Sequence, residues 1–165
     1  MFCGRHVRAC QKRGAAVGKT KRGKGTKLMV LADGAGAPLG VLVEAASPAE
    51  VKLLEPTLET LDQADLQGQP QRLIADKGYD SNTARELLVE RGIEPIIPAR
   101  KNNRKATHQD GRKLRRYKHR WIIERTNAWL QNFRRLAVRY ERSVVVFTAM
   151  VHLACALICL SRVLG

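Results

Sequence analysis

Residues 28–46 read LMVLADGAGAPLGVLVEAA, in which two apolar runs are separated by a short glycine-rich link. The first run covers 28–34 and the second covers 38–46. Short apolar runs joined by a turn of this composition predict two antiparallel β-strands. We therefore expect a β-hairpin here, and the remaining elements are assigned outward from it.

A helix is predicted directly after this hairpin, over residues 47–62. Ser47 and Glu50 have the spacing of a capping box, with Pro48 in the first helical turn. Leu54 and Leu58 then follow at helical spacing. We expect Ser47 to cap the helix with its side chain.

Strand and helix patterns alternate through the rest of the chain. The predicted elements are a strand at 71–76, a helix at 82–91 capped by Asp80 or Ser81, a strand at 93–99 and a long helix at 114–132. A hairpin followed by alternating helices and strands predicts an α/β domain. Its mixed sheet should have helices on both faces.

The composition suits one domain that binds a polyanion. The chain has 165 residues, of which 44% are hydrophobic, and its Lys and Arg residues outnumber its acids 30 to 15. A net charge of +15 favours nucleic acid as the partner. Four irregularly spaced cysteines and a basic first segment without an apolar core indicate a reducing, cytoplasmic setting.

The basic residues fall in two blocks. Residues 1–27 hold nine basic and no acidic residues, and residues 99–142 hold fifteen basic and three acidic residues. The segment between the blocks, residues 28–98, is acidic. Residues 10–27 are interpreted as a mobile basic loop. The alternatives to nucleic-acid contact by the two basic blocks are solvated faces or a ribosome-binding surface. The proposed DNA contacts in these blocks are Lys21, Arg22, Lys24, Arg112, Arg115 and Arg116.

The last part of the chain is apolar. Residues 144–160 carry one histidine, His152, and two cysteines, Cys155 and Cys159, that lie one helical turn apart. A membrane span needs about 20 apolar residues, so the segment is short for one. We expect a buried terminal helix over 143–164, with the cysteines as small buried side chains rather than zinc ligands.

Two carboxylates stand out as candidate site residues. Asp76 ends a predicted strand, at the edge where ligands of α/β sheets gather, although its position alone favours a residue that caps the next helix. Glu124 is one of three acids in the second basic block. It shares a helical face with Tyr117, Arg120 and Trp121, which predicts burial. It can be an ion-pair partner of Arg120, or a metal ligand whose neighbouring arginine contacts phosphate.

Two motifs resemble the DDE transposases of bacterial insertion sequences. They are RLIADKGYDS at 72–81 and YKHRWIIERTNAWLQNFRRL at 117–136, and residues 21–58 are also similar. Tyr117, Arg120 and Glu124 match the Tyr-x2-Arg-x3-Glu pattern of that family. The resemblance runs from Val7 to about Leu160. It implies an RNase H-like fold whose two aspartates and one glutamate hold two Mg²⁺ or Mn²⁺ ions.

The resemblance assigns Asp76 as the second acid and Glu124 as the third. Cys3 falls where the first aspartate belongs, and no acid precedes Asp33. Gln131 stands where the family has a lysine. Because a thiol suits Mg²⁺ poorly, the isolated chain is expected to be inactive. Cys3, His6 and Cys10 are too irregularly spaced for a zinc site.

The resemblance also implies partners and an organisation for the protein. The chain is expected to be a single truncated catalytic domain, residues 1–165, incomplete at its N-terminus. Its expected partners are transposon-end and target DNA in the bacterial nucleoid, a second copy in a homodimer, and an upstream transposase fragment that supplies the missing acid. The competing hypothesis is a non-catalytic basic nucleic-acid-binding protein.

Overall fold

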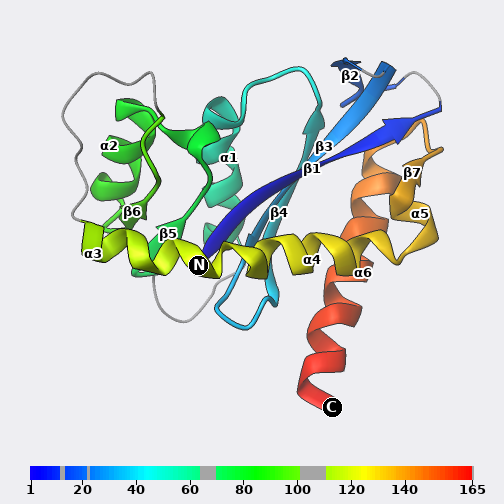
Figure 1. The fold of residues 1–165 in the computed structure, drawn as a ribbon. Coiled ribbons are helices and arrows are strands. Elements are labelled where there is room, and N and C mark those ends of the chain that lie inside the picture. The colour runs from blue at the N-terminus through cyan, green and yellow to red at the C-terminus, as the bar shows by residue number, and fades with distance from the viewer. Residues whose placement is uncertain (12–13, 22, 64–69, 101–110, 165) are drawn as a thin grey trace.

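A mixed β-sheet forms the centre of this computed structural model, and helices cover both of its faces (Figure 1). The structure describes residues 1–11, 14–21, 23–63, 70–100 and 111–164. The strands are β1 (Phe2–Cys10), β2 (Gly18–Thr20), β3 (Gly23–Ala32), β4 (Pro38–Ala45), β5 (Arg72–Ile74), β6 (Glu94–Ile96) and β7 (Val138–Arg139). The helices are α1 (Glu50–Asp62), η1 (Lys77–Tyr79), α2 (Asn82–Glu90), α3 (Gly111–Leu114), η2 (Arg115–Arg120), α4 (Trp121–Gln131), α5 (Arg134–Ala137) and α6 (Val144–Leu164).

Strand β1 joins an antiparallel half of the sheet to a parallel half. From one edge the order is β4, β3, β1, β5, β6, and the short strands β2 and β7 pair with β3 and β1. β3 pairs antiparallel with both β4 and β1, whereas β5 is parallel to β1 and to β6. The predicted hairpin and the predicted mixed sheet are confirmed.

Alternate residues of the central strands pack into two separate cores. Leu28 and Val30 join the core that contains residues of α4 and α6. Met29 and Leu31 point to the opposite face, where they pack with residues of α1 and α2. All four side chains are fully buried, as expected for a strand covered by helices on both faces.

The predicted capping box does not form. Helix α1 begins at Glu50 behind an Ala49 N-cap, with no side-chain capping bond. The Glu50 carboxylate is instead engaged by two cations of the sheet, Arg5 at 2.9 Å and Lys27 at 3.6 Å. Tertiary ion pairs therefore replace the local capping bonds. The other predicted cap is confirmed, because the Ser81 hydroxyl accepts a hydrogen bond from the Ala84 amide.

The expected mobile loop at 10–27 is largely replaced by strands. β2 pairs antiparallel with the start of β3, in register from Gly18 opposite Gly25 to Thr20 opposite Gly23. Residue Thr26 is fully buried, and its hydroxyl donates to the Ala16 carbonyl. Basic composition alone suggested a loop, whereas pairing with β3 orders the described part of the segment.

The long helix predicted at 114–132 is confirmed as a continuous helical segment over residues 111–131 that contains a 3-10 stretch (Figure 1). A 3-10 segment, η2, precedes α4. Side chains three residues apart eclipse one another in a 3-10 turn. This geometry places the Arg120 guanidinium over the Tyr117 ring, 5.6 Å from its centroid.

Helix α6 is buried along one face only, which corrects the expected burial of the whole segment. Its buried side chains, Phe147, Val151, Ala154 and Ile158, recur at helical spacing and pack in the core with α4. Leu153 and Leu157 are exposed, and the end of the helix projects beyond the sheet (Figure 1). The helix has the length and hydropathy of a membrane span, but so do core helices of soluble proteins.

Helix α4 lies against β1 because residue 4 is glycine. A Cβ atom at Gly4 would meet the Ile123 side chain at 2.5 Å, closer than real Cβ contacts. Ile123 is itself buried in the core between α4 and the sheet. The close approach of α4 to β1 therefore depends on this one missing side chain.

We expect Gly4→Val to destabilise the protein by about 1–3 kcal/mol, the usual cost of overpacking a core. Urea unfolding followed by circular dichroism measures the change. The matched control is Gly34→Val, because a Cβ there meets nothing within 4 Å. A surface change of that kind should remain within roughly 0.5 kcal/mol. Equal stability of the two variants would contradict the packing argument.

Candidate active site

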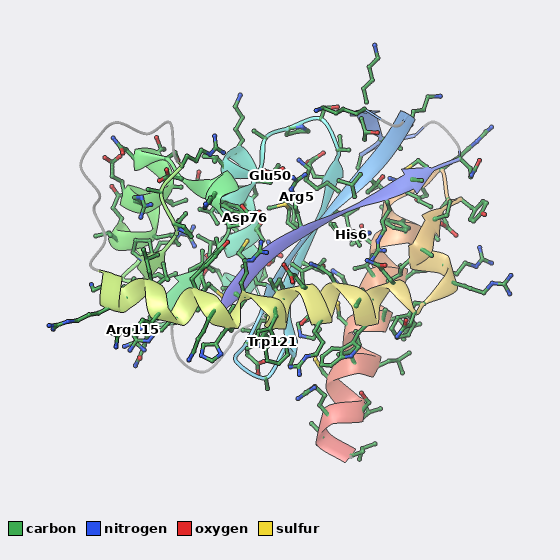
Figure 2. All side chains as sticks on the ribbon, viewed as in Figure 1. Arg5, His6, Glu50, Asp76, Arg115 and Trp121 are labelled. Carbon is green, nitrogen blue, oxygen red and sulfur yellow. The ribbon has the colours of Figure 1, made fainter. Side chains whose placement is uncertain are left out.

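Cys3, Asp76 and Glu124 line one small pocket of about 290 Å³. β1 contributes Cys3, the turn after β5 contributes Asp76, and α4 contributes Glu124. Arg5, His6, Arg120 and Asn127 also border the pocket. Figure 2 shows Arg5 and Asp76 close to one another near β1.

The pairing of β1 with β5 brings Cys3 to the pocket. Phe2, at the start of β1, lies opposite Ile74, at the end of β5. Cys3 follows Phe2, and Asp76 lies two residues after Ile74, so both residues are near this pair. The Cys3 thiol is fully buried and lies 3.4 Å from the Tyr79 hydroxyl. Burial raises the pKa of Cys3 to about 12, and the Asp76 and Glu50 carboxylates add to the rise. Position 3 therefore holds a neutral thiol.

Asp76 has the helix-capping role that was the alternative to metal binding. Its Oδ1 accepts a 2.6 Å hydrogen bond from the Gly78 amide at the start of η1. A Cβ at Gly78 would lie 2.6 Å from that oxygen and 3.0 Å from Glu50 Oε2. Glycine at position 78 therefore lets the Asp76 and Glu50 carboxylates both approach the backbone of this turn.

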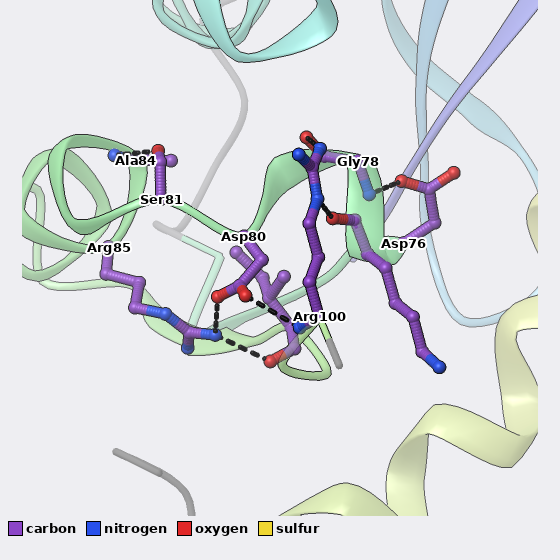
Figure 3. Close-up of polar contacts among 9 residues, drawn as sticks. Asp76, Gly78, Asp80, Ser81, Ala84, Arg85 and Arg100 are labelled. Atoms are coloured by element: carbon purple, nitrogen blue, oxygen red, sulfur yellow. Dashed lines mark hydrogen bonds and ion pairs between the residues drawn. The ribbon is translucent and has the colours of Figure 1, made fainter. Parts of the chain in front are cut away.

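A polar network fixes the turn that carries Asp76 (Figure 3). Arg100 donates hydrogen bonds from its guanidinium to the carbonyls of Lys77 and Gly78, at 2.7 and 2.8 Å. Its backbone amide donates to Asp80, whose buried carboxylate also pairs with Arg85 at 2.8 Å. These contacts hold the Lys77–Tyr79 turn in one conformation.

Glu124 is not buried, contrary to the sequence prediction. Its side chain is 56% exposed, and Oε1 lies 2.6 Å from a guanidinium nitrogen of Arg120 one turn earlier. Arg120 also covers the Tyr117 ring, so the three motif residues form a continuous chain of contacts. Tyr117 packs against the core, whereas Glu124 lies on the exposed side of the same helical segment.

Glu50 lies near the site, although no sequence pattern placed it there. Its Oε2 faces Gly78 beside Asp76, while Oε1 pairs with Arg5 and Lys27. Figure 2 labels Glu50 and Asp76 in the same region. Spacing within the sequence marked Glu50 only as a capping residue, because its sheet partners are distant in the chain.

Asn127 was not identified from the sequence, and His6 was considered there only as a zinc ligand. Asn127 lies one turn after Glu124, is 8% exposed and has a buried amide oxygen with no hydrogen-bond partner among the described residues. His6 lies 3.2 Å from the Gln131 amide nitrogen, and burial together with Arg8 lowers the pKa of His6 to about 4. Gln131, at the position where the resemblance implies a lysine, thus contacts His6 at the rim of the pocket.

The candidate DNA contacts form two surfaces. The hairpin surface consists of Lys21 and Lys24, both exposed, and the helical basic surface consists of Arg112, Arg115, Arg116, Tyr117 and Arg120. β2 and α3 lie at opposite ends of the molecule in Figure 1, and Figure 2 labels Arg115. The helical basic surface adjoins the pocket through Arg120. Arg22 lies outside the described residues.

The oxygen donors of the pocket fit a hard divalent cation, whereas Cys3 does not. Asp76, Glu124 and the unpartnered Asn127 oxygen are the ligand types that Mg²⁺ prefers, and the neutral Cys3 thiol is a soft donor. Among the described residues, no three His, Cys, Asp or Glu side chains converge as a metal-binding group. The two carboxylates therefore border the site without forming a complete ligand set.

Comparisons with known proteins agree on one family. The family model described as "Transposase DDE domain" matches residues 4–159. The protein assigned as the transposase of insertion sequence element IS402 from Burkholderia cepacia is 39% identical over 140 residues. That match covers 82% of this chain and 63% of the relative, so the chain spans less than two thirds of that protein.

A solved structure supports the fold. The piggyBac transposase, determined by cryo-electron microscopy in a synaptic complex with hairpin DNA, aligns with a TM-score of 0.60 at 11% identity. The alignment covers 93% of this chain and 45% of the piggyBac chain. The mixed sheet flanked by helices is therefore the RNase H-like fold that the resemblance implied. From its family match and its architecture, this chain belongs to the DDE transposase family of insertion sequences.

Proposed function

We propose that this domain acts in DNA transposition, binding transposon DNA along its helical basic surface next to a divalent-metal site for strand cleavage and transfer. The single observation that carries the proposal is the shared pocket of Asp76 and Glu124. These carboxylates come from a strand end and a helix that are far apart in the sequence. A structural ion pair between Arg120 and Glu124 alone gives no reason for Asp76 to face the same pocket.

Asp76 and Glu124 are the residues that would hold a Mg²⁺ or Mn²⁺ ion. When bound, such ions stabilise the attacking and leaving oxygens of an in-line phosphoryl displacement. Arg120 is already oriented by Tyr117 and by Glu124, and it can move from the carboxylate to a DNA phosphate. The fixed Lys77–Tyr79 turn keeps Asp76 in place during this exchange.

Cys3 limits the activity of this chain. In the two-metal arrangement that the family resemblance implies, the first carboxylate stands at this position. A neutral, fully buried thiol carries no charge to offset two divalent ions. We therefore propose a transposase domain that binds DNA and does not cut it as an isolated chain.

The second candidate function is a non-catalytic nucleic-acid-binding protein. Cys3 is the observation that favours it, since the same pocket cannot complete a carboxylate triad. This candidate requires only the basic surfaces and predicts no dependence of any activity on Asp76 or Glu124. The upstream fragment, the homodimer and the nucleoid location remain parts of the proposal for the whole protein.

We expect the chain to bind duplex DNA with little sequence preference. With ~6–10 phosphate contacts, the affinity should fall about 10³–10⁵-fold between roughly 50 and 200 mM salt. Changing Arg115 and Arg116 together to alanine should weaken binding and lower the salt slope by about 1 for each phosphate that is no longer neutralised. Fluorescence anisotropy with a labelled duplex measures both quantities.

The matched control for DNA binding is Lys52→Ala. Lys52 is exposed on α1, outside the hairpin surface and the helical basic surface. Its removal should leave the salt slope unchanged. A flat salt response of the unmodified chain, or equal losses of affinity in both variants, would contradict DNA binding through the helical basic surface.

We expect the unmodified chain not to nick supercoiled plasmid DNA with Mg²⁺ or Mn²⁺, and Cys3→Asp to introduce Mn²⁺-dependent nicking. The missing carboxylate removes several kcal/mol of transition-state stabilisation, and each ~1.4 kcal/mol changes the rate about tenfold. Agarose gels that separate supercoiled from nicked plasmid give the measurement.

The control for catalysis combines Cys3→Asp with Asp76→Asn. It should be inactive again if nicking depends on the proposed carboxylates. Nicking by the unmodified chain that Asp76→Asn abolishes would show that Cys3 is not the limiting position. Nicking that survives Asp76→Asn in every background would indicate a contaminating nuclease and would remove support for the site.

A further inference from the structure

Asn127 is a buried polar residue whose oxygen lacks a partner. The side chain is 8% exposed, and Oδ1 accepts no hydrogen bond from any described residue. Buried amide oxygens are normally paired, because an unpaired acceptor has lost its water without gaining a donor. The oxygen of an asparagine in this condition is available to a ligand that supplies the missing interaction.

The position of Asn127 connects this oxygen to the candidate active site. Asn127 follows Glu124 by three residues on α4, so the two side chains project from neighbouring turns of the same helix face. Both border the pocket that Cys3 and Asp76 also line. The Asn127 amide nitrogen lies 3.4 Å from the position of a Cβ at Gly4, which seats the side chain against β1.

The other polar side chains of the pocket already have partners within the protein. Glu124 pairs with Arg120, Asp76 accepts from the Gly78 amide, and Cys3 contacts Tyr79. The remaining two, Arg5 and His6, contact Glu50 and Gln131. Among the pocket residues that the structure describes, Asn127 is the one with a buried, unpartnered oxygen.

We propose that the amide oxygen of Asn127 is the third hard oxygen donor of the divalent-metal site, beside Asp76 and Glu124. The inference rests on the proposed function, because it assigns a further ligand to that same site. Carbonyl-type oxygens of asparagine suit Mg²⁺ and Mn²⁺ as the Cys3 thiol does not. Asn127 adds no charge, so it completes the oxygen set without replacing the missing carboxylate.

Binding of Mn²⁺ to the intact chain tests this assignment without requiring catalysis. Electron paramagnetic resonance measures free Mn²⁺ during titration of the unmodified protein, Asn127→Leu and Asn127→Asp. We expect Asn127→Leu to weaken Mn²⁺ binding about 10–100-fold, the usual effect of removing a group that supports a metal site. Asn127→Asp keeps the shape and adds charge, so it should bind Mn²⁺ at least as tightly as the unmodified chain.

Thermal unfolding distinguishes a ligand from a structural residue. Leucine fills the same volume and removes the unpaired acceptor, so Asn127→Leu should be as stable as the unmodified chain or more stable. A purely structural asparagine predicts the reverse, a lower unfolding temperature. The matched control is Asn132→Leu, at the end of α4 and outside the pocket, which should leave Mn²⁺ binding unchanged.

Two further variants separate failure of this inference from failure of the proposed function. If Asp76→Asn weakens Mn²⁺ binding and Asn127→Leu does not, the assignment of Asn127 is overturned and the metal site stands. If neither Asp76→Asn nor Glu124→Gln alters Mn²⁺ binding, or if the chain binds none, the proposed metal site fails and Asn127 has no ligand role.

Discussion

The contact between α4 and β1 at Gly4 is the constraint on which the candidate site depends. Ile123 occupies the space that any side chain at residue 4 would need. This contact sets the distance between α4 and the sheet. It therefore also sets the positions of Glu124 and Asn127, which lie on successive turns of α4. The same strand carries Cys3 one residue before Gly4, so packing and site geometry share a single segment.

Ion pairs and a buried neutral thiol lie on the same face of β1. Arg5, Lys27 and Glu50 form ion pairs on the face that also holds the buried Cys3 thiol and Asp76. Burial keeps that thiol protonated, so the protein avoids a further negative charge between two carboxylates. Cysteine is thus accommodated in the core at position 3, where the family resemblance implies an acid.

The two halves of the sheet contribute differently to the core and to the candidate site. The antiparallel half, β4, β3 and β1, contributes the continuous apolar strand that both cores share. The parallel half, β1, β5 and β6, sets the start of β1 against the end of β5 and so places Cys3 near the Asp76 turn. The network of Arg100, Asp80 and Arg85 then fixes this turn from outside the sheet.

Local sequence patterns determined the hairpin, the order of helices and strands between residues 50 and 131, and the Ser81 cap, because these depend on neighbouring residues. The predicted order did not include β1, the strand that joins the two halves of the sheet. Tertiary structure decided the rest. It exposed Glu124, ordered part of the basic segment as strands and left one face of α6 uncovered. It also placed Asn127 at the pocket and Glu50 beside Gly78 and Asp76. The physical reason is that burial and ion pairing are set by residues distant in sequence, whose approach only the folded sheet and its close packing at Gly4 define.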